Sequence, residues 1–477
     1  MRADGDIGAP GPMTLRFGTD GVRGPASEFP DALVVAIGRA AAEVLGATTF
    51  VIGRDTRESG ERLMRALATG LAAAGADPMN LGIVPTPAVA RVSAVRNVPG
   101  AVISASHNPW SDNGIKFFAA GGRKLSDELE ARLEARLDAE FGGRSSNSTT
   151  DDASDSPSVD PGPLPVDTDA VAEWSDAIVA SVGQLPPMHV VIDCANGAAS
   201  AVAPAILERL GLRADVLHDR PDGRNINDAC GSTHPADLQS AVVESGAALG
   251  LAFDGDADRL VAVDERGELV DGDQLIALFA SDMRARGSLT GDRVVVTVMS
   301  NLGFRLAMDE LGIEVVETAV GDRHVLEALA RTGSSLGGEQ SGHIVFADQA
   351  TTGDGILSGV RLVDLVARAQ RPLSELAAEV MERLPQVLRN VRLDRVRVVD
   401  SDDTSRTTAD SLADIIAIEL ADDIASVERA LGPRGRVLIR PSGTEPLVRV
   451  MVEAPTVSEA EEAADNLAAA VQRACSA

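Results

Sequence analysis

Four short segments of the sequence combine residue types that bind phosphate, a cation or a sugar. The first covers residues 103–109 (ISASHNP) and brings Ser106 and His107 into a predicted turn after an apolar run, with Lys116 close behind. Ser, His, Asn and Pro favour an irregular, exposed backbone. Such a turn would hold the Ser106 hydroxyl at the mouth of a sheet, where a phosphoryl group could reach it. A serine in a loop is more often a plain turn residue, and it is His107 and Lys116 that favour chemistry here.

The second segment, residues 254–259 (DGDADR), is acidic and follows another apolar run. It carries aspartates at alternate positions, namely Asp254, Asp256 and Asp258. Their oxygens can converge on one hard cation, and magnesium takes a few carboxylates together with phosphate oxygen. A calcium loop is an alternative because Glu265 stands at the twelfth position, but the residues in between read as a strand. A solvated acidic turn is the other alternative.

The third segment, residues 337–343 (GGEQSGH), has small residues that let the backbone close on a ligand. Glu339 and Ser341 offer an acceptor and a donor that suit neighbouring sugar hydroxyls. Taken alone, this pattern is also typical of a surface turn.

The fourth segment, residues 440–446 (RPSGTEP), ends a predicted strand in a Ser-Gly-Thr turn, and Arg449 follows. The backbone N–H groups and hydroxyls of such a turn can surround a tetrahedral anion, and arginines add charge-assisted hydrogen bonds. An ordinary capped turn remains an alternative for this segment by itself.

The elements that must position these segments follow an alternating strand and helix pattern, which is typical of α/β layers. We expect strands at 49–53, 101–104, 189–193, 249–253 and 293–298, and helices at 32–45, 60–74, 199–210, 272–286 and 303–311. The last ninety or so residues differ: strands at 386–393, 436–440 and 446–453 accompany helical stretches at 405–431 and from Ser458. The pattern predicts three doubly wound α/β domains and a C-terminal α+β domain.

Composition changes mark the expected boundaries between these parts. Residues 142–165 are rich in Ser, Asp and Pro and have few large apolar side chains, so burial cannot offset the entropy of ordering them. We expect a flexible tail (1–12), an α/β domain with the serine segment (13–141), a flexible linker or insert (142–167), an α/β domain with the acidic segment (168–267), an α/β domain with the third segment (268–385) and the C-terminal domain (386–477).

Composition also limits the function classes. The formal charge of −29 argues against nucleic acid and anionic membranes as partners, because both favour a basic face. The positive charge is almost all arginine, the better bidentate phosphate ligand, and the only lysines are Lys116 and Lys124. The chain shows no signal-peptide or membrane-span pattern, so we expect a cytoplasmic protein. Cys194, Cys230 and Cys475 have neither a disulfide nor a zinc-ligand spacing and read as buried small hydrophobes.

In order and spacing, these segments resemble the α-D-phosphohexomutase superfamily and, within it, the bacterial phosphoglucosamine mutases. Further matching segments are 17–24 (FGTDGVRG), 53–57 (GRDTR), 320–323 (VGDR) and 351–355 (TTGDG). The resemblance covers nearly the whole chain from Arg16 onward. It implies a fold in which three α/β domains and a mobile C-terminal domain surround one central cleft.

The resemblance also implies roles for individual residues. Ser106 would carry the phosphoryl group as phosphoserine, and Asp254, Asp256 and Asp258 would bind one Mg²⁺ together with that phosphate. The reacting phosphate would be lined by Arg23, His107, Lys116 and Arg259. The sugar loop would include Glu339, Ser341 and His343, near Asp322 and Arg323. The phosphate that does not react would bind Arg440, Ser442, Gly443, Thr444 and Arg449.

The implied reaction converts glucosamine 6-phosphate to glucosamine 1-phosphate through a sugar 1,6-bisphosphate, for UDP-N-acetylglucosamine synthesis. Phosphoserine donates its phosphoryl group to the free sugar hydroxyl, and the bisphosphate returns its other phosphate to Ser106. Our hypothesis for the base is Lys116 or His107. Gln340, where phosphomannomutase/phosphoglucomutases commonly have methionine, favours the amino sugar. The expected partner is a small hexosamine phosphate, and the chain would be a monomer or homodimer.

Three rival functions remain: phosphomannomutase/phosphoglucomutase activity, a catalytically silent regulator that binds sugar phosphates, and a phosphatase that loses the phosphoryl group to water. One departure from the family pattern bears on the acidic segment. Ala257 stands where glycine is frequent, and alanine would cost on the order of 1 kcal/mol if its φ is positive.

Overall fold

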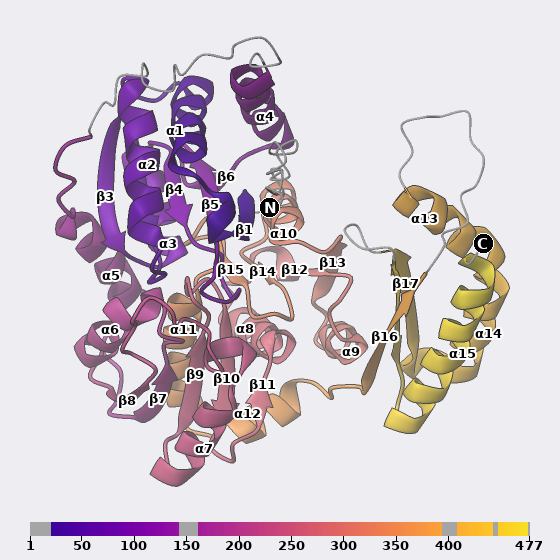
Figure 1. Ribbon diagram of the computed structural model, residues 1–477. Helices are drawn as coiled ribbons and strands as arrows, with labels where there is room; N and C mark the ends of the chain where they lie inside the picture. Colours follow the sequence, from indigo (N-terminus) through magenta and orange to yellow (C-terminus); the bar gives the residue numbers. More distant parts are fainter. Residues whose placement is uncertain (1–20, 143–160, 394–407, 442–446, 476–477) are drawn as a thin grey trace, which may run out of the picture. The chain divides into compact units, whose positions relative to one another are not determined.

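The computed structural model (Figure 1) describes residues 21–142, 161–393, 408–441 and 447–475. The chain divides into two compact units. One contains the described residues up to Val298 together with Val316–Ala377, and the other contains Met299–Val315 and the described residues from Ala378 onward. The predicted tail, most of the predicted linker, and residues 442–446 of the fourth segment lie outside the described residues.

The first sheet carries the serine segment. Its strands are β1 (Val22–Pro25), β2 (Thr49–Arg54), β3 (Asp77–Ile83), β4 (Gly100–Ile103), β5 (Asp112–Ala119) and β6 (Arg123–Lys124). The order is β1-β5-β4-β2-β3, with β6 beside β5. Strands β4, β2 and β3 are parallel, whereas β5 pairs antiparallel with β4, so the chain reverses at the serine loop.

Helices pack closely on this sheet. They are η1 (Ala26–Glu28), α1 (Asp31–Leu45), α2 (Gly60–Ala73), α3 (Thr86–Arg96) and α4 (Asp127–Gly142). Helices α1 and α2 touch through glycine, since a Cβ on Gly70 would lie 2.0 Å from the Val35 carbonyl oxygen. Their apolar faces enclose a core with Phe50 and Ile52 of β2, both almost fully buried.

The second sheet carries the acidic segment. Its strands are β7 (His189–Asp193), β8 (Arg213–Leu217), β9 (Leu249–Phe253), β10 (Leu260–Asp264) and β11 (Leu269–Val270), in the order β11-β10-β9-β7-β8. Its helices are α5 (Thr168–Val182), η2 (Ala198–Ala201), α6 (Ala203–Arg209), η3 (Gly231–Thr233) and α7 (Ala236–Ser245). Strands β8, β7 and β9 are parallel, and β9 and β10 form an antiparallel hairpin. The acidic segment is the connection of that hairpin.

The helix expected at 199–210 is divided in two. A 3₁₀ turn ends near Val202, whose ψ of −35° accompanies a φ of −134°, and α6 begins at Ala203 with a proline in its first turn. Proline is tolerated in the first turn of a helix but not in its interior, and Pro204 therefore sets a new helix start.

The third sheet carries the third segment, residues 337–343, which we call the sugar segment after its predicted ligand, and has the order β13-β12-β14-β15. Its strands are β12 (Arg293–Thr297), β13 (Glu314–Thr318), β14 (Leu336–Gly338) and β15 (Ile344–Phe346). Its helices are α8 (Gly272–Ala285), η4 (Thr290–Asp292), α9 (Leu302–Glu310), α10 (Asp322–Thr332), α11 (Gly355–Ala369) and α12 (Leu373–Val380).

The C-terminal sheet is antiparallel with the order β16-β18-β17. Its elements are β16 (Gln386–Arg392), α13 (Thr408–Glu419), α14 (Ala421–Leu431), η5 (Gly432–Arg434), β17 (Arg436–Pro441), β18 (Leu447–Glu453) and α15 (Val457–Cys475). Alternate residues of β18, such as Val448 and Val450, pack against Leu467 and Val471 of α15. The fold class expected from the sequence is confirmed: three α/β domains precede a C-terminal domain. None of the helices in the described ranges has the length and apolar character that a membrane crossing needs.

Candidate active site

Ser106 lies in the loop between β4 and β5 and is only 2% exposed. Its φ of 51° is left-handed, which is uncommon for a residue other than glycine. Its backbone N–H donates to Ser104 Oγ at 2.9 Å, which helps to fix this conformation. Its own Oγ donates to Asp254 Oδ2 at 2.7 Å and lies 3.3 Å from His107 Nδ1. The loop therefore aims the hydroxyl at the acidic segment.

A fully buried arginine, Arg57, holds the serine loop by donating hydrogen bonds to its main-chain carbonyls. Arg57 Nη2 donates to the carbonyl oxygens of Ser106 at 2.9 Å and Asn108 at 2.8 Å, and its Nη1 donates to the Asp112 carbonyl at 3.0 Å and to the Pro109 carbonyl. Asp55 Oδ2 accepts Arg57 Nε at 2.9 Å. A guanidinium presents several donors in one plane, so a single side chain fixes several carbonyls of the loop.

A second side chain, from the irregular stretch between β8 and η3, holds the same loop. Asn227 Nδ2 donates to the Ser106 carbonyl at 2.9 Å and to the Asn108 carbonyl at 3.0 Å. Arg57 and Asn227 are not among the site residues predicted from the sequence. For Arg57 the matching segment 53–57 was a signal, whereas Asn227 lies in an irregular stretch that carries none.

The acidic segment gathers its aspartates in a small buried volume. One carboxylate oxygen from each of Asp254, Asp256 and Asp258 lies within 4.8 Å of the others. Lys116 Nζ lies 3.6 Å from Asp256 Oδ2 and 3.5 Å from Asp258 Oδ2. The Thr86 hydroxyl donates to Asp256 Oδ2 at 2.6 Å, a contact that the sequence did not predict. Ala257 has a φ of 53°, so the condition under which alanine is less favourable than glycine at this position applies.

Burial and neighbouring charges shift the pKa values of several side chains in and beside this cluster. Burial and the charges of Asp258 and Asp256 hold the pKa of Asp254 well above its usual range. Burial also raises the pKa of Asp258, but Lys116 and His343 outweigh it and hold that pKa well below its usual range. Burial, together with the positive charges of Arg259 and Arg23, lowers the pKa of His107 to about 4, so this imidazole is neutral at pH 7.

The donor set fits a hard divalent cation. Asp256 Oδ1 and Asp258 Oδ1 are buried and have no hydrogen-bond partner in the part of the chain that the structure describes. A buried carboxylate oxygen without a partner is costly, and a bound cation would compensate it. The calcium-loop alternative does not hold, because the residues after Arg259 form β10 instead of completing a ligand loop.

The sugar segment packs directly on the acidic segment. It is a tight turn between β14 and β15, in which the Gly342 N–H donates to the Glu339 carbonyl at 2.9 Å. The Leu260 N–H donates to the Gly342 carbonyl at 3.0 Å, and a Cβ on Gly342 would lie 2.0 Å from the Leu260 carbonyl oxygen. Ser341 is exposed and Glu339 is half-buried. His343 is buried and lies 3.6 Å from Asp258 Oδ2.

Other predicted substrate residues have protein partners. Asp322 pairs with Lys124 and lies 3.6 Å from His343 Nε2. Arg323 is buried and pairs with Asp127 and Glu130 of α4, so its role in substrate binding stays a prediction. Arg23 lies on β1 opposite Gly114, and Arg259 Nε lies 3.8 Å from Asp258 Oδ1.

The C-terminal unit places two arginines side by side. Arg440 of β17 and Arg449 of β18 are directly opposite each other in the antiparallel register. Burial and the charge of Arg449 lower the pKa of Arg440, and Arg449 Nε is buried and has no hydrogen-bond partner among the described residues. Like charges directly opposite each other destabilise a sheet, so this pair suits an anion. Ser442, Gly443 and Thr444 lie outside the described residues.

Comparisons with known proteins find matches for all four domains of the chain. Family models for the domains of phosphoglucomutase/phosphomannomutase match residues 14–142 (alpha/beta/alpha domain I), 168–267 (domain II), 271–384 (domain III) and 390–470 (C-terminal domain). The chain therefore belongs to the phosphoglucomutase/phosphomannomutase family, in the α-D-phosphohexomutase superfamily of isomerases.

Within this family, the similar curated proteins are named for one activity, that of phosphoglucosamine mutase. A phosphoglucosamine mutase of Desulforudis audaxviator is 49% identical over 457 residues, which cover 93% of this chain and 94% of that protein. A phosphoglucosamine mutase of Frankia alni is 48% identical, covering 97% of this chain and 99% of the relative.

Solved structures agree with the fold. A phosphoglucomutase/phosphomannomutase family protein of Burkholderia thailandensis is 26% identical with a TM-score of 0.77, covering 96% of this chain and 97% of that one. The N-acetylphosphoglucosamine mutase of Aspergillus fumigatus, solved with GlcNAc-6P and magnesium, is 20% identical with a TM-score of 0.64, covering 97% of this chain and 96% of that one.

Proposed function

We propose that this chain is a phosphoglucosamine mutase that interconverts glucosamine 6-phosphate and glucosamine 1-phosphate through phosphorylated Ser106. The observation that carries the mechanism is the 2.7 Å hydrogen bond from Ser106 Oγ to Asp254, inside a cluster of three buried carboxylates. The assignment to the amino sugar rests on relatives that are 45–49% identical over nearly the whole chain.

Ser106 alternates between accepting and donating a phosphoryl group. In one half-reaction the bond from Ser106 Oγ to phosphorus breaks while the free sugar hydroxyl forms its own bond to phosphorus, which gives a sugar 1,6-bisphosphate. In the other half-reaction Ser106 Oγ attacks the second phosphate and the sugar hydroxyl leaves. Arg57 and Asn227 hold the backbone of the loop, so Oγ stays in place through both steps.

Asp254, Asp256 and Asp258 would hold Mg²⁺, in line with the magnesium named for the Aspergillus structure. When bound, the cation supplies charge stabilisation for the transferring phosphoryl oxygens. The protein adds Lys116 and Arg259, whose side chains already lie near the same carboxylates. The positive charges of Lys116 and Arg259 would favour a dianionic phosphoryl group on Ser106 over the neutral hydroxyl.

Two side chains are our candidates for moving the hydroxyl proton. His107 is next to Ser106 Oγ and its imidazole is neutral, so it has a free lone pair, but its lowered pKa makes it a weak base. Lys116 lies deeper, between Asp256 and Asp258. Comparing pH–rate profiles of His107→Ala and Lys116→Ala separates them, because loss of the base removes one limb of the profile. If turnover is unchanged in both variants, neither residue is the base.

Arg440 and Arg449 would bind the phosphate that does not react. Their opposed positions on β17 and β18 provide two guanidinium groups for one anion. The predicted turn 442–444 would add backbone donors. We also propose that Glu339 and Ser341 bind the sugar hydroxyls, and that the enzyme works in the cytoplasm.

A coupled assay tests the function. Purified protein with Mg²⁺ and a trace of hexose 1,6-bisphosphate is given glucosamine 6-phosphate, glucose 1-phosphate or mannose 1-phosphate in turn. We expect a large preference for the amino sugar, abolished in Ser106→Ala. A preference for a neutral sugar would instead favour the phosphomannomutase/phosphoglucomutase alternative, and release of inorganic phosphate without isomer formation would identify a phosphatase.

A further inference from the structure

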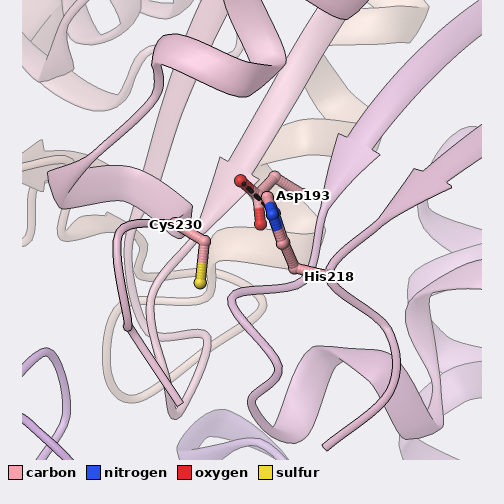
Figure 2. A group of neighbouring side chains, drawn as sticks. All are labelled: Asp193, His218 and Cys230. Atoms are coloured by element: carbon pink, nitrogen blue, oxygen red, sulfur yellow. Dashed lines mark ion pairs between the residues drawn. The ribbon is translucent and has the colours of Figure 1, made fainter. Parts of the chain in front are cut away.

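A second group of potential metal ligands lies in the sheet that carries the acidic segment, outside the catalytic cluster. Asp193 ends β7, His218 directly follows β8, and Cys230 precedes η3 (Figure 2). Because β7 and β8 are parallel neighbours, their carboxyl ends meet at the same edge of the sheet, and the returning loop brings in Cys230. One carboxylate oxygen, one imidazole nitrogen and the sulfur lie within 4.8 Å of one another.

These atoms retain capacity for a ligand. His218 Nδ1 lies 3.1 Å from Asp193 Oδ2, yet it is buried and makes no hydrogen bond with any residue that the structure describes. Asp193 Oδ2 accepts the Gly231 N–H at 2.9 Å, which uses one of the two lone pairs of that oxygen. The Cys230 sulfur has a weak contact with Asn196 Nδ2 at 4.0 Å and is fully buried.

The other imidazole nitrogen supplies an independent indication. His218 Nε2 lies 3.4 Å from Asp237 Oδ2. A histidine that binds a metal through one nitrogen almost always donates the other ring N–H to a carboxylate, a carbonyl or water, which fixes the ring. Asp237 is in the position of that outer carboxylate, with Nδ1 next to Asp193.

A cysteine nucleophile is the competing explanation for this trio, and the surroundings oppose it. A reactive cysteine needs a lowered pKa and access to solvent. Burial and the charge of Asp193 raise the pKa of the Cys230 thiol to about 12. A cation with affinity for sulfur has no such requirement, because it deprotonates the thiol that it binds.

We propose that Asp193, His218 and Cys230 form a binding site for a divalent cation of borderline softness, with zinc the best match. Zinc takes carboxylate, imidazole and thiolate ligands at about 2.0 to 2.3 Å, in tetrahedral geometry. Water would complete the set on the side where the His218 ring is 25% exposed. On binding, the S–H bond of Cys230 breaks, a sulfur–metal bond forms and one proton passes to solvent.

The site would act on the catalytic loop through Asn227, three residues before Cys230. Asn227 donates to the carbonyls of Ser106 and Asn108, so fixing Cys230 fixes one of the two supports of the serine loop. The bound cation would therefore have a structural role and would affect catalysis through Asn227 and the serine loop. This proposal does not depend on which sugar the enzyme uses.

The test uses cobalt as a spectroscopic substitute for zinc. Chelator-treated full-length protein is kept in excess Mg²⁺, which the oxygen ligands of the acidic cluster prefer, and is titrated with Co²⁺. We expect a thiolate-to-cobalt charge-transfer band at one equivalent, bleached by Zn²⁺. Cys230→Ser abolishes the band, whereas Cys194→Ser, the matched change at another fully buried cysteine, retains it.

A second pair of variants avoids buried positions. Asp237→Asn changes a side chain that is 68% exposed and weakens Co²⁺ and Zn²⁺ binding by about 10- to 100-fold. Asp219→Asn removes the same charge next to His218 and leaves the affinity unchanged. The absence of the band in the folded wild-type protein, its persistence in Cys230→Ser, or equal affinities for the two aspartate variants would each overturn the proposal.

Discussion

Replacing Asp254 by asparagine should make the metal-free protein more stable and the magnesium-bound protein less stable than the wild type. The three carboxylates lie within 4.8 Å of one another. At an effective dielectric constant of about 20, each pair of charges at that distance repels by about 3.5 kcal/mol. Neutralising Asp254 removes two such repulsions, about 7 kcal/mol, and one attraction of similar size to Arg259, which leaves about 3 kcal/mol net.

Asparagine preserves the local hydrogen bonds. Asp254 accepts the Arg259 N–H at 3.2 Å through Oδ1, which the amide oxygen retains, and the amide nitrogen can donate to Ser106 Oγ. Because the pKa of Asp254 is raised, the folded wild type binds a proton that the unfolded chain releases at lower pH. Its stability therefore falls as the pH rises above the unfolded value, and the advantage of the variant should grow from pH 5 to pH 8.

Thermal unfolding in EDTA and in increasing Mg²⁺ measures the effect. At about 2 °C per kcal/mol, the variant should unfold about 6 °C higher in EDTA at pH 8. Wild type gains about 2.7 kcal/mol at 100 times its dissociation constant and about 4.1 kcal/mol at 1,000 times, so the order reverses in that range. Asp228→Asn, the same charge change at an exposed site of the same domain, should shift neither curve. A variant less stable than wild type in EDTA would refute the repulsion argument.

Three further predictions concern other parts of the chain. Asn227→Gly keeps the left-handed backbone but removes both hydrogen bonds to the serine loop, so kcat should fall by up to about 100-fold with little change in KM; an equal loss in both would contradict a positioning role. Burial raises the pKa of Asp354 to about 6 from 3.8, so wild type should lose about 3 kcal/mol relative to Asp354→Asn as the pH rises from 4 to 7, and parallel stability curves would refute this. Inorganic phosphate should raise the melting temperature of the C-terminal unit in wild type but not in Arg440→Met, and an equal rise would remove Arg440 from the anion site.

The sequence was a good guide to regular elements and to residues within one segment. Strands 189–193 and 249–253 form as expected, because apolar runs of that length between turn residues are typical of central strands. The alternate aspartates after Phe253 converge, because a hairpin connection confines their side chains to a small volume. The sequence indicated a strand after Arg259, which is β10, but the antiparallel direction of β5 and β10 was not anticipated, since strand direction depends on pairing and not on local composition.

Contacts between segments far apart in the chain could not be predicted from the sequence. Nothing local to Asn227 indicates that its amide will meet the carbonyls of Ser106 and Asn108, more than a hundred positions away. The same holds for Cys230, whose spacing from His218 and Asp193 matches no metal motif, although the edge of the sheet brings the three together. The partners of Arg323 on α4 were missed for the same reason.

The hydrogen bonds from Arg57 to the serine loop bear on how the loop is held through a complete turnover of the proposed reaction. The guanidinium bonds to main-chain carbonyls and not to the hydroxyl, so none of these contacts uses the atom that would carry a phosphoryl group. A phosphoryl group on Ser106 Oγ would therefore displace none of these hydrogen bonds. The same support would serve the phosphorylated form as donor at one carbon of the sugar and the unphosphorylated form as acceptor at another.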